Sequence, residues 1–181
     1  MVGGAPIPPK TQEFTRNVLN VILSQGYGST ETVGNGMFTD EFDMSLGKVG
    51  GPLCGLRVKL VSWTEGGYCV TDKPNPRGEI HFCSDSVAIG YYQLDNLSES
   101  SFYHDDNNRR WFRTGDIAEV LPNGCFKIID RKKDFIKFAF GEYISLGKVR
   151  HFFKQFFSFK RDSCVSSLCF VFVLCVQFIC Q

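Results

Sequence analysis

Apolar residues recur at helical spacing near the start of the chain. Two prolines, Pro8 and Pro9, stand just before this stretch. The apolar positions between Thr11 and Leu23 are Phe14, Val18, Leu19, Val21 and Ile22. Because this spacing gives a helix one apolar face, and proline commonly begins a helix, the pattern predicts an amphipathic helix from Thr11 to Leu23. The turn that starts at Gln25 is expected to cap it.

Further along, apolar and polar residues alternate, as in half-buried strands. Residues 56–60 place Arg57 and Lys59 between apolar neighbours, and residues 78–82 have a similar character. Two more strands are predicted at 117–121 and 126–130, because the Pro-Asn-Gly sequence between them suits a tight hairpin. Residues 95–110 are rich in Asp and Asn and are expected to form a solvent-exposed helix and loop.

Charge and cysteine usage exclude several classes of protein. The 181 residues include 20 basic and 19 acidic side chains, for a net charge of +1, without a long run of either sign. Nucleic acid is therefore not an expected partner. The eight cysteines form no CxxC pair, which favours reduced intracellular thiols over a metal site. No charged region followed by an apolar core marks a signal peptide at the start.

The segment from Gln25 to Thr32 combines the groups that a nucleotide requires. Gly28 lets the backbone approach a phosphate, and the Ser29 and Thr30 hydroxyls can donate to phosphate oxygens. The Glu31 carboxylate can hold Mg²⁺, and the Tyr27 ring can stack on a base. The same residues also suit an ordinary connecting loop. On turn chemistry alone, the two interpretations are equally favoured.

Three other short motifs accompany this segment in a characteristic order. They are Gly3-Gly4-Ala5-Pro6, Arg113-Thr114-Gly115-Asp116 and Asp130-Arg131-Lys132-Lys133-Asp134. In order and approximate spacing, the four resemble the adenylate-forming superfamily. Longer stretches resemble eukaryotic long-chain fatty acyl-CoA synthetases: Gly66-Gly67-Tyr68, Thr71-Asp72-Lys73-Pro74, Pro76 to Ile80, Gly90-Tyr91-Tyr92, Ile128 to Lys133, and Gly141 to Val149. The resemblance covers residues 1–150.

The resemblance implies an α+β fold and a division of the chain into three parts. Residues 1–129 would be the C-terminal part of the large AMP-binding domain, a β-rich subdomain with helices. Residues 130–150 would be the hinge and the start of the small C-terminal domain, and residues 151–181 would be an atypical hydrophobic tail. Enzymes of this family are several times longer, so the chain is expected to be a fragment.

The implied activity is that of a ligase. ATP activates a long-chain fatty acid to an acyl-adenylate, and coenzyme A then displaces AMP to give acyl-CoA, with Mg²⁺ assisting. The family's phosphate loop and its C-terminal lysine have no match here, and Arg150 stands where an acidic residue is usual. We therefore expect little or no ligase activity from this polypeptide alone.

Site residues follow from the resemblance, motif by motif. Tyr27 would lie against adenine, in a pocket walled by Gly3, Gly4, Ala5 and Pro6. Asp116, in a predicted tight turn, would accept the ribose hydroxyls, and Arg131 would bind the ribose and phosphate region. Gly28, Ser29 and Thr30 would face the phosphates, Thr30 and Glu31 would act in catalysis, Glu31 would hold Mg²⁺, and Gly141 would meet the pantetheine arm of coenzyme A. Without the resemblance, Tyr27 suits a buried core and Ser29 and Thr30 suit a helix cap.

The tail differs from everything before it. Several phenylalanines and basic residues precede a stretch from Cys164 to Cys180 that carries no charge. A C-terminal membrane anchor is one interpretation, with an intracellular location at the endoplasmic reticulum or the mitochondrial or peroxisomal surface. A misassembled gene end is the other, favoured by the abrupt end of the family pattern. A noncatalytic nucleotide-binding fragment and a tail-anchored membrane-associated protein therefore stand as alternative functions.

Overall fold

A computed structural model describes residues 1–137, 143–147 and 149. The chain divides into two compact units, Met1–Ile129 and a second that begins at Asp130. The predicted border lies at the same place, and a hinge there stays a prediction. Gly141 and the tail of residues 151–181 lie outside the described residues. None of the helices in the described part combines the length and apolar character that crossing a bilayer requires.

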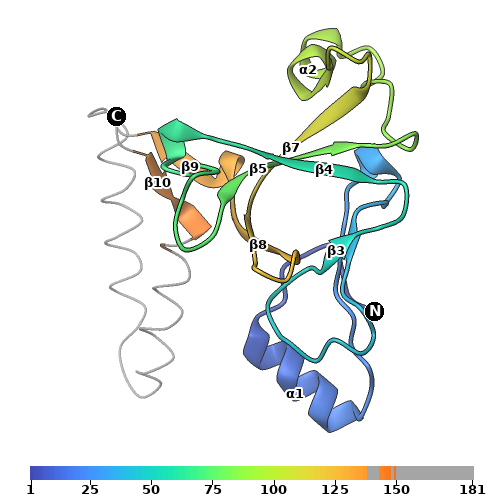
Figure 1. Ribbon diagram of the computed structural model, residues 1–181, viewed down its shortest axis with the longest axis vertical. Coiled ribbons are helices and arrows are strands. Elements are labelled where there is room, and N and C mark those ends of the chain that lie inside the picture. The colour runs from blue at the N-terminus through green and yellow to red at the C-terminus, as the bar shows by residue number, and fades with distance from the viewer. Residues whose placement is uncertain (138–142, 148, 150–181) are drawn as a thin grey trace, which may run out of the picture. The chain divides into compact units, whose positions relative to one another are not determined.

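An antiparallel sheet forms the centre of the first unit (Figure 1). Its strands lie in the order β4 (Arg57–Val61), β5 (Arg77–Cys83), β7 (Arg110–Val120) and β6 (Phe102–His104), and β8 (Phe126–Arg131) pairs with β7. The antiparallel register of β4 and β5 places Val58 opposite Phe82 and Leu60 opposite Ile80. The four predicted strands are confirmed, since each overlaps β4, β5, β7 or β8.

The solvated stretch after β5 is confirmed only in part. Helix α2 (Asp95–Ser101) and the loop that follows β6 are largely exposed. Phe102, however, begins strand β6 and is buried, with its ring centroid 5.2 Å from that of Phe112. Strand β6 therefore begins at a buried apolar residue that follows the polar helix, and the composition of the segment did not predict it.

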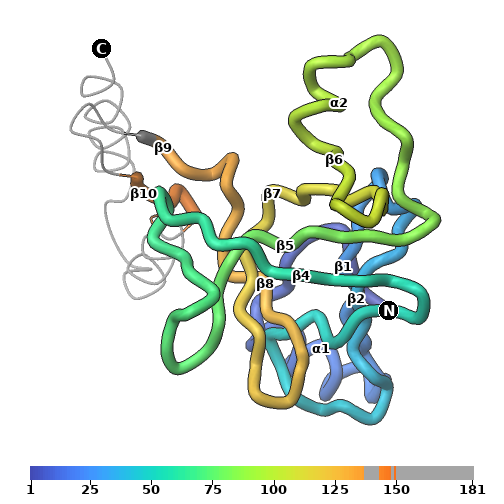
Figure 2. Tube along the Cα trace, turned by 45° about the horizontal axis from the view of Figure 1, so that its top comes forward, coloured from blue at the N-terminus to red at the C-terminus, as the bar shows by residue number. Residues whose placement is uncertain are grey.

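A smaller antiparallel sheet carries the start of residues 25–32, the segment that we call the tyrosine turn. It consists of β1 (Gly26–Tyr27), β2 (Met37–Phe38) and β3 (Gly51–Pro52). The first residues of the chain run beside it, because Val2 bridges to Gln25 in parallel fashion (Figure 2). Gly36 is required for this packing, since a Cβ there would lie within 1.9 Å of the Tyr27 carbonyl oxygen.

The main core lies between residues of these two sheets. Its buried members are Met37, Val49, Leu56, Ile80, Phe82 and Ala118, with Tyr27, Val58 and Leu60 packed against them. Ile80 and Phe82 have no exposed surface. Burying a side chain of this size stabilises the fold by about 1.5–3 kcal/mol. Tyr27 is therefore held against the best-packed part of the molecule.

The first helix, α1 (Pro9–Leu19), is shorter at its end than predicted. It stops because Asn20 adopts a left-handed conformation (φ 49°) and its N–H bonds to the Arg16 carbonyl. The predicted apolar face is wrong as a packing surface, since Phe14, Val18, Leu19, Val21 and Ile22 are 44–66% exposed. Gln12 is the residue of this helix that is buried, and its side chain accepts a hydrogen bond from the Gly47 N–H at 3.1 Å. The tyrosine turn does not cap the helix, because residues 20–24 separate them.

Short elements complete the described chain. Single 3₁₀ turns are η1 (Thr30–Thr32), η2 (Thr64–Gly66) and η3 (Lys132–Asp134). In the second unit, β9 (Phe135–Lys137) pairs antiparallel with β10 (Tyr143–Ser145). The Ser145 hydroxyl donates to Asp130 Oδ1 at 2.8 Å, which ties the second strand to the start of this unit.

Candidate functional site

Two predicted site residues from distant parts of the sequence meet directly. The Tyr27 hydroxyl donates a hydrogen bond to Asp116 Oδ2 at 2.7 Å, across a separation of 89 residues. Tyr27 belongs to β1 and Asp116 to β7, so the contact joins the small sheet to the large one. The Asp116 side chain is buried, and the Tyr27 ring lies 5.9 Å from the ring of Phe82. We call this contact the Tyr27–Asp116 pair.

Asp116 is held by the residues just before it and by the neighbouring strand. Its N–H bonds to Thr114 Oγ at 3.0 Å, and the Thr114 hydroxyl donates to the Ile80 carbonyl at 2.9 Å. Gly115 takes a left-handed φ of 71°, and its N–H donates to Glu79 Oε1 at 3.1 Å. The predicted tight turn is wrong. These residues stay within β7, where a register shift between Glu79 and His81 of β5 accommodates the glycine.

Beneath this backbone lies a buried polar pair that sequence reasoning missed. Glu79 Oε2 lies 3.2 Å from His81 Nε2, close enough for attraction when the histidine is protonated, although the geometry is not that of a hydrogen bond. His81 Nδ1 is also 2.8 Å from the Tyr103 hydroxyl. Both Glu79 and His81 are buried. The available signal was a glutamate and a histidine two positions apart in a strand with apolar neighbours.

Glu31 makes a second contact between a tyrosine and a carboxylate. The Tyr91 hydroxyl donates to Glu31 Oε1 at 2.6 Å, and the Ala88 N–H donates to the Glu31 carbonyl oxygen at 2.8 Å. Burial, the hydrogen bond and the negative charge of Glu31 together raise the pKa of the Tyr91 phenol. We call this contact the Tyr91–Glu31 pair. Tyr91 belongs to a matched motif, but no feature of the sequence assigned it a role.

The remaining residues of the tyrosine turn differ in exposure. Thr30 is exposed and Ser29 is half-buried, whereas Thr32 is fully buried. Thr32 stabilises the turn, because its hydroxyl accepts from the Ser29 N–H at 3.3 Å and donates to the Ser29 carbonyl at 3.1 Å. Gly28 lies close to the returning chain, where a Cβ would be 2.6 Å from the Gly34 carbonyl oxygen.

The predicted wall of the adenine pocket lies at the exposed start of the chain. Gly3, Gly4, Ala5 and Pro6 are all exposed. Val2 anchors them beside the strand that leads to Tyr27, since the Gly26 N–H donates to the Val2 carbonyl at 2.8 Å. A Cβ on Gly3 would lie 3.1 Å from the Gly26 carbonyl oxygen. The segment therefore lies next to β1, as a wall close to Tyr27 requires.

For two further predicted binding residues, a place at this site stays a prediction. Arg131 is exposed at the end of β8 and belongs to the second unit, so its contact with a nucleotide stays a prediction. Gly141 lies outside the described residues. Within the described residues, no group of three or more His, Cys, Asp or Glu side chains could hold a metal ion by itself.

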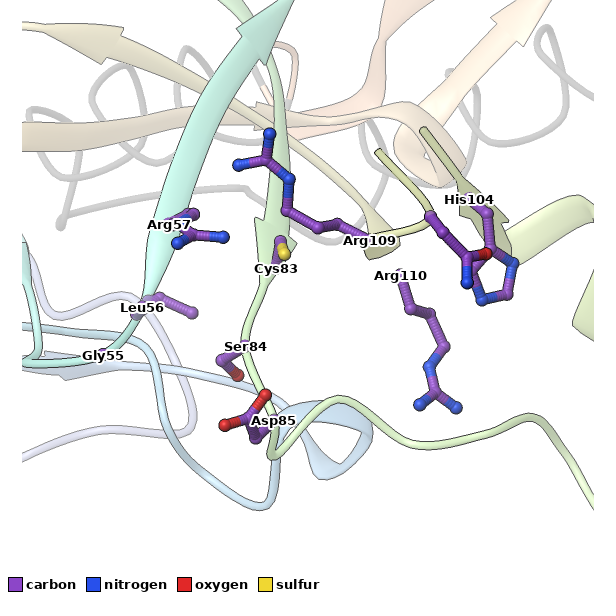
Figure 3. Close-up of a pocket in the computed structure, with 10 residues that line it drawn as sticks. Gly55, Leu56, Arg57, Cys83, Ser84, Asp85, His104, Arg109 and Arg110 are labelled. Carbon is purple, nitrogen blue, oxygen red and sulfur yellow. The ribbon is translucent and has the colours of Figure 1, made fainter. Parts of the chain in front are cut away.

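A separate cavity of about 770 Å³ lies elsewhere in the first unit (Figure 3). Its walls come from the start of β4, the end of β5 with the loop that follows, and the connection between β6 and β7. None of the predicted site residues lines it. Its charged lining residues are Arg57, Asp85, Arg109 and Arg110, together with His104.

Comparison with known proteins gives a consistent result at the level of sequence. Residues 1–92 match the family described as AMP-binding enzyme. The chain is 48% identical over 150 residues to long chain acyl-CoA synthetase 8 of Arabidopsis thaliana, covering 82% of this chain and 21% of that protein. Long chain acyl-CoA synthetase 1 of the same plant is 42% identical over 155 residues, covering 84% and 22%. The chain thus spans about a fifth of the length of these curated relatives.

Solved structures agree on the fold. The A domain of carboxylic acid reductase from Segniliparus rugosus, in complex with AMP and a co-purified carboxylic acid, matches with a TM-score of 0.62 and 33% identity, over 81% of this chain and 21% of that chain. O-succinylbenzoate coenzyme A synthetase from Bacillus subtilis, in complex with ATP and magnesium ion, matches with a TM-score of 0.63 and 30% identity, over 82% and 29%. The predicted α+β class is confirmed by these neighbours.

Proposed function

The chain belongs to the family of AMP-binding enzymes, and we propose that it carries the nucleotide-recognition part of a long-chain fatty acyl-CoA synthetase. The proposed reaction of the whole enzyme is the ATP-dependent conversion of a long-chain fatty acid to an acyl-adenylate and then, with coenzyme A, to acyl-CoA. Its support is the similarity to two long chain acyl-CoA synthetases of Arabidopsis thaliana.

The observation that carries this proposal is the hydrogen bond of 2.7 Å between Tyr27 and Asp116. An aromatic ring can lie against a base, and a carboxylate can accept hydrogen bonds from paired ribose hydroxyls. A carboxylate has two acceptor oxygens and can accept several hydrogen bonds at once. On this proposal, the Tyr27 ring would lie against the base, and the Asp116 carboxylate beside it would accept the ribose hydroxyls of the same nucleoside.

The phosphates would lie toward the tyrosine turn. The exposed Thr30 and the half-buried Ser29 would donate hydroxyl hydrogen bonds, and Gly28 would allow the close approach of backbone N–H groups. Glu31 would hold Mg²⁺, which supplies charge neutralisation as pyrophosphate leaves. Magnesium is commonly held by one or two carboxylates plus substrate phosphates. A single carboxylate at the turn fits that pattern, and the Bacillus subtilis neighbour was solved with ATP and magnesium ion.

Other parts of the proposal rest on the family resemblance. Arg131 would bind the ribose and phosphate region, and Gly141 would leave room for the pantetheine arm of coenzyme A. Membrane association and an intracellular site at an organelle surface stay predictions that depend on the tail. Because the chain spans about a fifth of the length of its curated relatives, the 181-residue polypeptide alone should form little or no thioester from ATP, palmitate and coenzyme A.

Calorimetric titration of the 181-residue chain with AMP tests the proposal. The unmodified chain should bind AMP, and Asp116→Asn should bind it about tenfold to a hundredfold more weakly, since a hydrogen bond to a charged group contributes about 1.5–3 kcal/mol. Asp106→Asn is the matched control, because Asp106 is exposed in a loop. The proposal is wrong if AMP does not bind, or if Asp116→Asn binds as well as the control.

A further inference from the structure

Three arginines face the cavity shown in Figure 3, at a distance from the Tyr27–Asp116 pair. Arg57 begins β4, whereas Arg109 and Arg110 lie where the chain enters β7. Asp116 lies six residues beyond Arg110 on β7, which is about 20 Å at the usual rise of a strand. A phosphate group near Asp116 cannot also contact Arg110. The cavity is therefore a separate place on the molecule.

The charge of the cavity wall is positive. Arginine is always protonated in proteins, so the three guanidinium groups outnumber the carboxylate of Asp85. Arg109 has a partner outside the cavity lining, since its Nε lies 3.4 Å from Asp105 Oδ2. Even with that ion pair counted, Arg57 and Arg110 exceed the one acidic group that lines the space.

Among the three arginines, Arg110 gives the strongest evidence for a ligand. Its Nε is enclosed, yet it has no hydrogen-bond partner within the part of the chain that the structure describes. In Figure 3, Arg57 and Arg110 lie on opposite sides of the open space, with Ser84 and Asp85 on the loop between them. Because no acceptor among the described residues holds Nε, the Arg110 guanidinium keeps hydrogen-bonding capacity that an anionic ligand could use.

Guanidinium chemistry selects the class of ligand. The planar fork of arginine matches the oxygens of a phosphate with two parallel hydrogen bonds, and arginines on opposite walls suit a ligand with more than one anionic group. A volume of about 770 Å³ lies within the range of small-molecule sites. We propose that this cavity is a second anion site that binds a small, soluble compound carrying two linked phosphates.

Calorimetric titration of the full chain with pyrophosphate tests this proposal. Arg57→Gln and Arg110→Gln should each raise the Kd of the cavity site at least tenfold, because each removes one charged hydrogen-bonding fork. Lys127→Gln is the control, since Lys127 is an exposed cation on β8 and should leave the Kd within twofold. Thermal unfolding should show that the variants fold. Arg57 is itself exposed, so its variant remains informative if Arg110→Gln does not fold.

A further variant separates this site from the proposed nucleotide site. Asp116→Asn should leave the pyrophosphate affinity of the cavity unchanged, even if AMP binding proves absent or altered. The proposal is overturned if pyrophosphate does not bind, if both arginine variants bind it as the unmodified chain does, or if only Asp116→Asn changes its affinity.

Discussion

Two contacts between a tyrosine and a carboxylate can be compared within the first unit. The Tyr27–Asp116 pair has a donor–acceptor distance of 2.7 Å and the Tyr91–Glu31 pair one of 2.6 Å. The first joins two strands and rests on a packed core, whereas the second joins a 3₁₀ turn to a loop. The same chemistry is thus built once on a rigid scaffold and once on loops. Under the proposed function, the first pair would fix the position of a nucleoside, and the second would allow the tyrosine turn to adjust to the phosphates.

Removing the support beneath the rigid pair should have the largest effect. Phe82 has no exposed surface and packs against the Tyr27 ring. Phe82→Ala should reduce the free energy of unfolding by about 3–5 kcal/mol, through lost burial and the cavity left behind. Urea denaturation measures this change. Phe42→Ala, at a position 80% exposed, should change stability by no more than about 0.5 kcal/mol. Equal effects at the two positions would contradict the assignment of the core.

The second-largest effect is expected from replacing Glu79, the buried glutamate. Glu79→Ala leaves the Gly115 N–H without its acceptor and His81 without its neighbour, at a cost of about 1–3 kcal/mol. It should also weaken AMP binding, because Gly115 positions Asp116. Glu99→Ala, on the exposed face of α2, is the control. If Glu79→Ala lowers stability but leaves AMP affinity unchanged, Glu79 does not position Asp116.

The pair on loops should be easier to break. Tyr91→Phe removes the hydroxyl that donates to Glu31 and should cost about 1 kcal/mol in unfolding free energy. Tyr92→Phe is a close control, because Tyr92 is 89% exposed. We expect the control to be neutral, and a loss at Tyr92 equal to that at Tyr91 would show that the Glu31 contact contributes nothing.

The smallest of these effects is expected at alkaline pH, and it concerns the Tyr91–Glu31 pair. The pKa of Tyr91 is raised in the folded chain by burial and by Glu31, so the folded state keeps this proton at a pH where the unfolded state loses it. The stabilisation is therefore complete below the usual tyrosine pKa of about 10 and declines as pH rises past it. Tyr91→Phe should reduce the decline in unfolding free energy above that pH. An identical decline in both proteins would contradict the shift.

Local patterns were sufficient for much of the fold. Alternation predicted β4 and β5, and an Asn-Gly turn predicted the connection between β7 and β8, because these signals depend on neighbouring residues alone. The end of α1 was not predictable in this way. Val21 and Ile22 continue the apolar spacing past Asn20, although the backbone has already turned into a left-handed conformation there. The packing of that helix depends on contacts that spacing does not encode.

The site shows the same limit. A motif identified Tyr27 and Asp116 individually, but their contact depends on the register of strands 89 residues apart. The roles of Glu79 and Tyr91 were not predictable for a related reason. Each contacts a residue of a predicted motif that lies on another element. Glycine favours a turn around Gly115, whereas pairing with β5 keeps this backbone within a strand.

The most direct measurement is a double-mutant cycle on AMP affinity with Tyr27→Phe, Asp116→Asn and the double variant. If the two residues form one nucleotide site through their mutual hydrogen bond, each single change weakens binding, and the double variant binds about as well as Asp116→Asn alone. Independent effects that multiply in the double variant, or AMP affinity unchanged by all three, would contradict that claim.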